Sequence, residues 1–189
     1  KDGCTPLSIA AQYGHSAVVT ALLAAGADVD KADKDGFTPL FAAAQEGHTA
    51  VVTTLLDAGA DVNNAAEDSW NPLYKAAQNG HSAVVTALLD AGADINKVTK
   101  NGSTPLFAAA FKMHDEVTKI LLRAGADVDK AIAVAEKYNQ PAAIKLITSL
   151  QTKIEEEAAA QAPDINQMVA YIKICGYCGK EDDGMMKCA

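Results

Sequence analysis

Apolar residues along the chain fall into two alternating patterns that return at a constant interval. The first is a short alanine-rich run that follows Thr-Pro-Leu, as in residues 5–12. The second places Val and Leu at helical spacing, as at Val18, Val19, Leu22 and Leu23. Residues three and four apart share one face of an α-helix. The pattern therefore predicts a short helix followed by an amphipathic one, with polar turns between successive pairs.

The interval between these predicted helix pairs is 33 residues. Four rows align over residues 1–33, 34–66, 67–99 and 100–132, and one histidine marks the register of each row: His15, His48, His81 and His114. A fixed period of this length is typical of proteins built from stacked units. Because no single row can bury its own apolar face, we expect the rows to stack and to form one continuous core.

Polar residues and glycines at repeated positions predict where the helices begin and end. Each first helix starts at a proline, which suits the first helical turn, and follows a residue whose side chain can cap it. These capping residues are Thr5, Thr38, Asn71 and Thr104. Gly14, Gly47 and Gly80 should end first helices in the left-handed conformation. The second helices should end at Gly26, Gly59, Gly92 and Gly125.

The motifs DGxTPL and AAQxGHxAVVxxLLxAGADV, with the 33-residue period, closely resemble the ankyrin repeat. The resemblance covers four rows, residues 1–130. It implies a mainly α fold, an ankyrin-repeat solenoid in which each repeat has a β-hairpin or turn (the finger) and two antiparallel helices. One position departs from the family pattern. The histidine that usually follows Thr-Pro-Leu is replaced by Ser8, Phe41, Tyr74 and Phe107.

The period weakens after residue 130. Residues 131–150 are interpreted as a degenerate capping repeat of two short helices, the second starting at Pro141. Residues 151–168 are predicted to be a polar helical linker that breaks at or before Pro163. Phe111 and Met113 replace a glutamine and a helix-ending glycine of the earlier rows. This change fits either a divergent penultimate repeat or a local binding feature.

The last segment, residues 169–189, contains three cysteines, of which Cys175 and Cys178 are spaced as zinc ligands and Cys188 follows. The stretch CGYCGKEDDGMMKCA resembles the opening of a MYND-type zinc finger, a module often joined to ankyrin repeats. A RING-type finger could begin in the same way, and it would imply a ubiquitin ligase whose repeats select the substrate. In both families the first two cysteines bind one zinc ion and the third binds another. We therefore expect zinc in a longer protein, of which this chain is a fragment with no complete site.

Composition narrows the class of function. The 189-residue chain has a formal net charge of −8, and no apolar run approaches the roughly 18 residues that span a membrane. The charge argues against nucleic-acid binding, which requires clustered Lys and Arg, and favours a neutral or basic protein partner. The 4 cysteines do not resemble a disulfide framework. We expect a monomeric protein of the cytosol or nucleus, with reduced thiols.

The sequence shows no motif for catalysis. It lacks a Gly-rich phosphate loop, a nucleophile elbow and paired carboxylates. The register histidines of adjacent rows should lie roughly 8–10 Å apart, too far to share one metal ion. We expect each histidine to make a local structural hydrogen bond. The repeated residues Asp28, Asp30, Asp33 and Asp35 are interpreted as turn and cap residues. The sequence therefore indicates a binding protein and not an enzyme.

Partner binding is expected where the rows differ, because the shared residues are used in folding. In ankyrin proteins similar positions, at the finger tips and at the exposed ends of the first helices, form the concave binding surface. We transfer that role by position only. The predicted partner-binding residues are Cys4, Tyr13, Asp35, Phe37, Glu46, Asp68, Trp70, Asn79, Asn101, Ser103 and Lys112.

Phe37 and Trp70 are the strongest candidates among them, because large aromatic side chains dominate interface energetics when they become buried. The alternative role for each ring is packing against the neighbouring finger. Next to Trp70, Ser69 replaces the turn glycine of the other rows, so we expect that finger to differ in shape. A purely structural spacer is the competing interpretation of the array, and it would show no cluster of exposed aromatic side chains.

Overall fold

The computed structural model describes residues 3–66 and 68–161, and this part of the chain contains ten helices and no strand. The helices are α1 Pro6–Gln12, α2 Ser16–Ala24, α3 Pro39–Glu46, α4 Thr49–Asp57, α5 Pro72–Asn79, α6 Ser82–Asp90, α7 Pro105–Phe111, α8 Asp115–Arg123, α9 Val128–Lys137 and α10 Pro141–Gln161. The chain up to Ile154 forms one compact unit. The mainly α repeat fold predicted from the sequence is confirmed.

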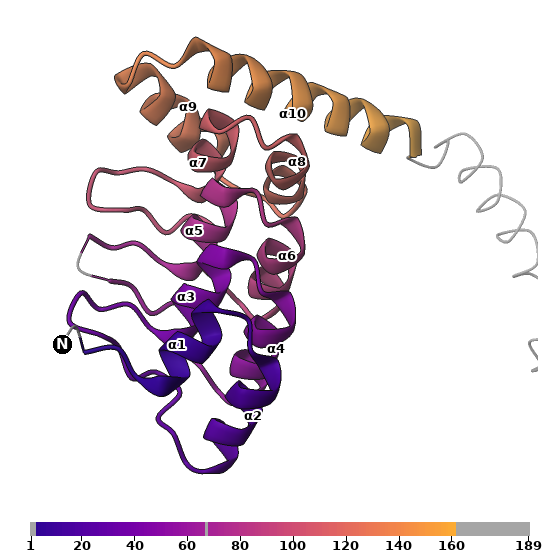
Figure 1. Ribbon diagram of the computed structural model, residues 1–189. Coiled ribbons are helices and arrows are strands. Elements are labelled where there is room, and N and C mark those ends of the chain that lie inside the picture. The colour runs from indigo at the N-terminus through magenta and orange to yellow at the C-terminus, as the bar shows by residue number, and fades with distance from the viewer. Residues whose placement is uncertain (1–2, 67, 162–189) are drawn as a thin grey trace, which may run out of the picture. The chain divides into compact units, whose positions relative to one another are not determined.

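The first eight helices alternate between two layers (Figure 1). Helices α1, α3, α5 and α7 contact one another in succession and form one layer, while α2, α4, α6 and α8 form the other. The loops that lead into α3, α5 and α7 project to one side as the fingers. This arrangement places equivalent residues of successive rows next to one another, so the rows together present one face along the stack.

Side-chain caps start the first helix of each pair, as the sequence predicts. Thr38 Oγ1 accepts a hydrogen bond from the Phe41 N–H at 3.2 Å, and Asn71 Oδ1 accepts one from the Tyr74 N–H at 2.8 Å. Gly47 ends α3 in the left-handed conformation, with φ 79°. Asn71 is buried, and its Nδ2 has no hydrogen-bond partner among the described residues. The threonine of the other rows avoids that desolvation cost.

The core is one continuous apolar cluster that runs through the rows. Leu40, Leu55, Leu73 and Leu88 occupy equivalent places in two successive helix pairs, and each is at most 1% exposed. Alanines of the first helices, such as Ala43, are fully buried, and their small side chains let the helices approach closely. The apolar side chains of neighbouring rows therefore bury one another, which is how a repeat array gains its stability.

The register histidines join each row to the row before it. In three rows the imidazole Nε2–H donates to a main-chain carbonyl oxygen of the preceding first helix: His48 to Gln12 at 2.9 Å, His81 to Gln45 at 2.9 Å and His114 to Gln78 at 3.1 Å. The structural role predicted for the histidines is confirmed in these three rows, but the bond is not local, because its acceptor lies in the neighbouring row. The ring of His15, in the first row, stacks on Tyr13 with centroids 6.2 Å apart.

The same histidines explain why the first helices end at glycine. A Cβ atom on Gly14, Gly47 or Gly80 would lie 2.6 to 2.7 Å from ring atoms of the histidine in the next row. These three glycines also have φ between 70° and 80°. Glycine is therefore required at each of these positions for two independent reasons. A side chain would clash with the imidazole ring, and the backbone has a positive φ that favours glycine.

Helices α9 and α10 form a further helix pair, which follows α8 without a finger. Asn139, with φ 50°, lies just after α9, and Met113, with φ 60°, lies at the equivalent place after α7. The Gln140 N–H then donates to the Ala135 carbonyl at 2.8 Å, so Gln140 stands at the histidine position of the earlier rows. A methionine is thus tolerated at 113, because no imidazole of a following row occupies the space beside it.

The sequence prediction of a short second helix in this last pair is wrong. Helix α10 is 21 residues long and continues to Gln161 without a break at residue 150. It therefore extends through the first part of the segment predicted to be a polar helical linker. Among the described helices, none is both long and apolar enough to cross a lipid bilayer.

The repeated aspartates hold the turns together, as predicted. Asp28 Oδ1 accepts a hydrogen bond from the Asp30 N–H at 3.1 Å. Asp33 Oδ1 accepts two, from the N–H groups of Asp35 at 3.0 Å and Phe37 at 2.9 Å. The Asp30 carboxylate in turn accepts a bond from the main chain of the next row. These side chains satisfy backbone donors that the turns leave unpaired.

Candidate functional site

Each finger is a tight loop closed by main-chain hydrogen bonds. In the loop before α3, the Asp33 N–H donates to the Phe37 carbonyl at 3.1 Å, and the Gly36 N–H donates to the Asp33 carbonyl at 3.2 Å. The loops before α5 and α7 repeat both bonds at equivalent residues. Phe37 and Trp70 therefore stand at the same place in two fingers, immediately before the capping residue.

The finger before α5 keeps this turn although Ser69 replaces glycine. Ser69 has φ 59°, compared with 81° for Gly36 and 83° for Gly102. Its N–H donates to the Ala66 carbonyl at 2.8 Å, as the glycine does in the other fingers. The prediction of a different shape is therefore wrong for this turn. A serine at positive φ is strained, because its Cβ crowds the main chain.

We expect Ser69→Gly to raise the free energy of unfolding by about 0.5–1 kcal/mol, since glycine adopts positive φ without a crowded Cβ. Urea unfolding followed by circular dichroism measures the change. The reverse substitution Gly36→Ser, in the preceding finger, should lower stability by a similar amount. A lower stability for Ser69→Gly would show that the serine is not strained.

A hollow of about 190 Å³ lies between the fingers before α3 and α5. It is lined by two aromatic rings, one methyl group and two carboxylates, from Asp35, Phe37, Ala66, Asp68 and Trp70. The structure thus brings together four predicted partner-binding residues from two rows. The rings are half-buried and the aspartates are exposed. Apolar walls with a negative rim suit an apolar side chain that has a basic neighbour.

Both aromatic rings of the hollow are held by contacts within their own rows. The Phe37 ring stacks on Phe41, with centroids 4.5 Å apart. The Lys75 ammonium lies 4.3 Å from the centroid of the Trp70 ring and donates to Gln78 Oε1 at 3.0 Å. Partial burial lowers the pKa of Lys75. The rings are therefore positioned before any partner arrives, which limits the side-chain entropy that binding would remove.

A second hollow, of about 240 Å³, adjoins Phe37 on the side of the first row. It is lined by Cys4, Ser8, Gln12, Asp33, Phe37, Phe41, Ala42 and Gln45. Cys4 is exposed, and its thiol is free. Phe37 lines both hollows, so its ring forms part of the wall of each.

The residues predicted at the ends of the first helices all lie on the surface, with different surroundings. Tyr13, Glu46 and Lys112 are exposed, Tyr13 at 65%. Asn79 is exposed too, but its Nδ2 donates to the Gln45 carbonyl at 2.8 Å. Asn79 therefore helps to join two rows, in addition to any contact with a partner.

The finger before α7 differs from the two before it. Asn101 is exposed, whereas Ser103 is only 7% exposed and its side chain hydrogen-bonds to Tyr74. Ser103 is therefore the one predicted partner-binding residue whose side chain is buried, and partner binding by it stays a prediction. Lys100 joins this finger to the preceding one. Its N–H donates to the Asp68 carbonyl at 3.0 Å, and its Nζ lies 3.9 Å from the Asp68 carboxylate.

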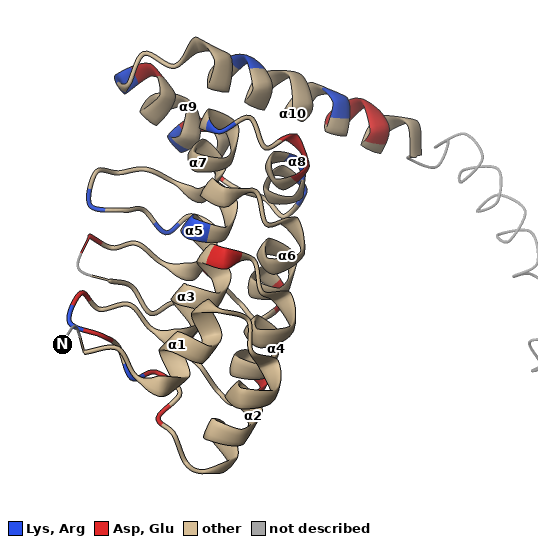
Figure 2. Ribbon diagram, viewed as in Figure 1, with Lys and Arg blue, Asp and Glu red and all other residues tan. Residues whose placement is uncertain are grey.

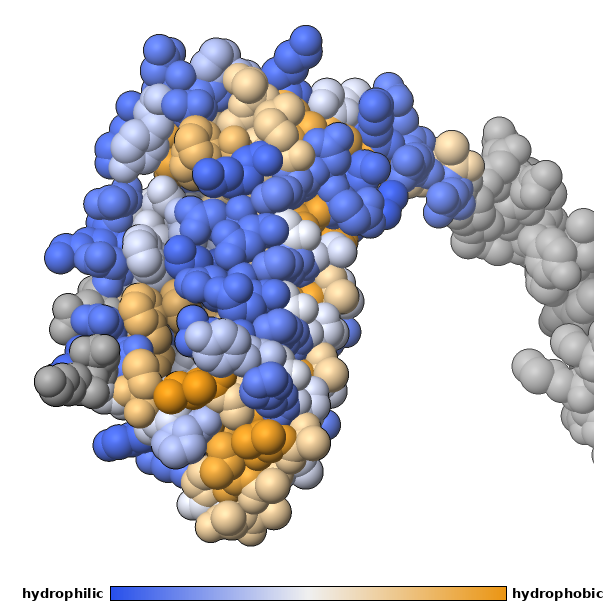
Figure 3. All heavy atoms as spheres, in the orientation of Figure 1, coloured by the Kyte–Doolittle hydropathy of each residue, from blue (hydrophilic) through white to orange (hydrophobic). Residues whose placement is uncertain are grey.

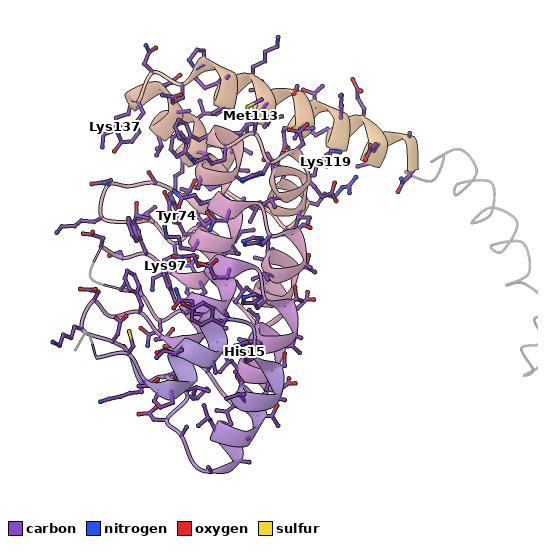
Figure 4. The ribbon with its side chains drawn as sticks, in the orientation of Figure 1. His15, Tyr74, Lys97, Met113, Lys119 and Lys137 are labelled. Atoms are coloured by element: carbon purple, nitrogen blue, oxygen red, sulfur yellow. The ribbon has the colours of Figure 1, made fainter. Side chains whose placement is uncertain are left out.

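At the position after each Pro-Leu pair, three of the four rows carry an aromatic residue. Phe41, Tyr74 and Phe107 are buried, and Tyr74 lies in the inner layer beside the fingers (Figure 4). Burial raises the pKa of the Tyr74 hydroxyl. In the first row Ser8 and Thr5 instead form a reciprocal cap, with bonds of 2.9 and 3.0 Å. Sequence analysis singled out this position, but it did not show that Phe41 stacks on Phe37 of its finger or that Phe107 stacks on Phe111 and Tyr138.

The described residues contain no group of three or more His, Cys, Asp or Glu side chains that could hold a metal ion. The predicted zinc ligands Cys175, Cys178 and Cys188 lie outside the residues that the structure describes. Zinc binding by these thiols therefore stays a prediction. Sequence reasoning also missed Lys75, whose position over Trp70 depends on the geometry of the finger.

Comparison with protein-family models agrees with this architecture. The model for ankyrin repeats, which describes three copies, matches residues 1–66 and 59–132. The chain belongs to the ankyrin-repeat family. A search of curated proteins finds no match. Ankyrin repeats are generally protein-interaction modules, which is the class of function that the hollows and fingers fit.

Proposed function

We propose that this chain is a protein-interaction scaffold whose partner binds the face formed by the fingers and the first helices. The observation that carries the proposal is the hollow between two fingers, lined by Phe37 and Trp70 with Asp35 and Asp68 at its rim. This lining favours a partner that inserts an apolar side chain and places a basic one beside the carboxylates. The net charge of −8 favours the same kind of partner.

In this proposal the chain recognises its partner through a rigid, preformed surface, and no chemical reaction is involved. The two rings are fixed by Phe41 and Lys75, and the fingers are closed by main-chain hydrogen bonds. A surface that is already ordered loses little conformational entropy on binding, so more of the contact energy appears as affinity. The apolar walls supply that energy when the partner displaces water from them.

Substitution of Trp70 tests this proposal. A peptide selected from a random library for binding to the intact chain serves as the probe, and calorimetry measures its affinity. We expect Trp70→Ala to weaken binding by about 30-fold or more, because truncating an aromatic hot spot costs about 2 kcal/mol or more. Thr86→Ala, on the exposed side of α6, is the control and should leave the affinity unchanged.

Two outcomes would contradict the proposal. The first is equal affinity of the parent chain and Trp70→Ala at unchanged melting temperature, because the hollow would then not be the contact. The second is a selection that yields no binding peptide, which would favour the structural-spacer interpretation.

We also propose that the fourth helix pair, α7 with α8, is a complete ankyrin repeat, and that Cys175, Cys178 and Cys188 open a MYND-type zinc finger in a longer protein. The thiol spacing supports the zinc finger. A RING-type finger, with the repeats selecting the substrate of a ubiquitin ligase, is the alternative. A location in the cytosol or nucleus, where thiols stay reduced, belongs to the same proposal.

Sequencing the source transcript beyond Ala189 tests the zinc finger directly. A cysteine two residues after Ala189, followed by further Cys and His at short spacing, is the expected result for the MYND type. A histidine directly after Ala189, with RING spacing beyond it, would replace that proposal with the ligase. A stop codon would overturn both.

A further inference from the structure

The ends of α7 and α9 carry an exposed aromatic cluster, which the second and third rows lack. Phe111 is the last residue of α7 and Tyr138 caps α9, and they are 44% and 41% exposed. The buried Phe107 ring lies between them, with its centroid 5.7 Å from that of Phe111 and 6.1 Å from that of Tyr138. The space-filling view shows apolar residues over α7 and α9 with hydrophilic residues around them (Figure 3).

Each exposed ring of this cluster has a lysine ammonium over it. Lys112 Nζ lies 5.6 Å from the Phe111 centroid, and Lys137 Nζ lies 5.3 Å from the Tyr138 centroid. Lys137 also donates to the Asn101 carbonyl at 3.4 Å. Within the described part of the chain, neither ammonium pairs with a carboxylate. Phe111, Lys112, Lys137 and Tyr138 are together called the C-terminal patch.

The repeat itself does not require this patch. The rows before it carry glutamine at the position of Phe111, and the carbonyl of that glutamine accepts the histidine bond from the next row: Gln12, Gln45 and Gln78. Beyond Phe111 the histidine position is Gln140, whose side-chain amide donates to the Tyr138 carbonyl at 3.0 Å. Phe111 is 44% exposed although its ring stacks on Phe107, so part of its apolar surface is left for contact with another molecule.

The charge on the finger side differs between the two surfaces (Figure 2). The hollow between the fingers has Asp35 and Asp68 at its rim. The finger before α7 carries Lys97, and the two lysines of the C-terminal patch follow it, whereas Lys100 of that finger lies 3.9 Å from the Asp68 carboxylate. Glu136 is the acidic residue that adjoins the patch in sequence. A partner segment that suits one surface electrostatically is therefore disfavoured at the other.

We propose that the C-terminal patch binds an acidic segment of a partner protein that carries an aromatic or aliphatic side chain among its carboxylates. The apolar side chain covers the exposed faces of Phe111 and Tyr138, and the carboxylates pair with Lys112 and Lys137. This inference rests on the proposed function only in that the ligand is a protein segment. The residues involved are different from those of the hollow between the fingers.

Three fluorescein-labelled peptides test the patch by fluorescence anisotropy with the full chain. The first has glutamates on both sides of a central Phe-Leu pair, the second has lysines in place of the glutamates, and the third has serines in place of Phe-Leu. We expect the first peptide to bind more tightly than both others. Its affinity should fall as the salt concentration rises, because exposed charges are screened.

Variants of the chain locate the site of binding. Phe111→Gln restores the residue of the other rows and should therefore fold; we expect it to weaken binding of the acidic peptide about tenfold. Lys112→Glu with Lys137→Glu should reduce binding below detection, and Trp70→Ala should leave it unchanged. Melting temperatures establish that each variant is folded, and Tyr138→Gln replaces Phe111→Gln if that variant unfolds.

Several results would overturn this inference while leaving the proposed function intact. One is equal affinity of the acidic peptide for the parent chain and the folded Phe111→Gln variant. Another is loss of its binding in Trp70→Ala, which would place it in the finger hollow. A third is a dimer, detected by sedimentation, that Phe111→Gln dissociates and the acidic peptide does not, because a second copy of the chain would then be the occupant.

Discussion

Gly47→Ala is expected to lower the free energy of unfolding by about 3 kcal/mol or more, combining a strained backbone with a lost inter-row hydrogen bond. Gly47 has φ 79°, and a Cβ on it would lie 2.6 Å from Nδ1 of His81. The imidazole must therefore move, and its 2.9 Å hydrogen bond to the Gln45 carbonyl is disrupted. Urea unfolding followed by circular dichroism measures the effect.

Gly59→Ala is the matched control for this prediction. Gly59 has φ 87°, but a Cβ there meets nothing within 4 Å, so its substitution carries the backbone strain alone, about 1–2 kcal/mol. In the double variant Gly47→Ala/His81→Ala the clash is absent, and the combined loss should be smaller than the sum of the single losses. Equal losses for Gly47→Ala and Gly59→Ala would show that the histidine ring does not restrict this position.

Leu88→Ala is expected to lower the free energy of unfolding by about 3–4 kcal/mol, because the site loses buried methyl groups and leaves a cavity. Leu88 is fully buried in α6, in the middle of the stack, and belongs to the continuous core. A central repeat packs against the rows on both sides, so a cavity at Leu88 weakens its interfaces with both neighbours. Thermal and urea unfolding measure the change.

The next residue along α6 supplies the comparison. Leu89 is only partly buried, so Leu89→Ala should cost less than half as much as Leu88→Ala. Leu88→Met keeps the volume and should cost less than about 1.5 kcal/mol. A similar loss for Leu88→Ala and Leu89→Ala would contradict the assignment of Leu88 to the core between rows.

Most of the architecture could be predicted from the sequence because the repeat depends on local chemistry. The residue before each proline, such as Thr38, caps its helix through a bond to the main chain a few residues away, so this signal does not depend on the tertiary structure. Glycines such as Gly47 end a helix because they adopt positive φ without strain. The family model that matches residues 1–66 and 59–132 confirms the ankyrin repeats that these signals indicate. Burial of the Val and Leu positions then follows from the helical spacing.

The sequence-based expectations and the structure differ at residues whose contacts or conformation are set by other parts of the fold. The structural role expected for His81 is confirmed, but its bond is not local, because the acceptor is Gln45 of the row before. Ser103 was predicted to bind a partner, but it is only 7% exposed and lies beside Tyr74 of the preceding row. Ser69 was expected to change its finger, but the hydrogen bonds of the loop hold it in the conformation of a glycine. Sequence position alone does not specify which residues of adjacent rows meet.

The sequence by itself determined the family, the helix pairs and the positions at which the rows differ, because period, caps and apolar spacing are properties of the chain. Only the tertiary structure decided that Phe37 and Trp70 line one hollow and that Phe111 and Tyr138 share the buried ring of Phe107. Residues of different rows are brought together by stacking, and the distances between them depend on how the helices pack. The candidate binding surfaces are therefore properties of the stack and not of any single row.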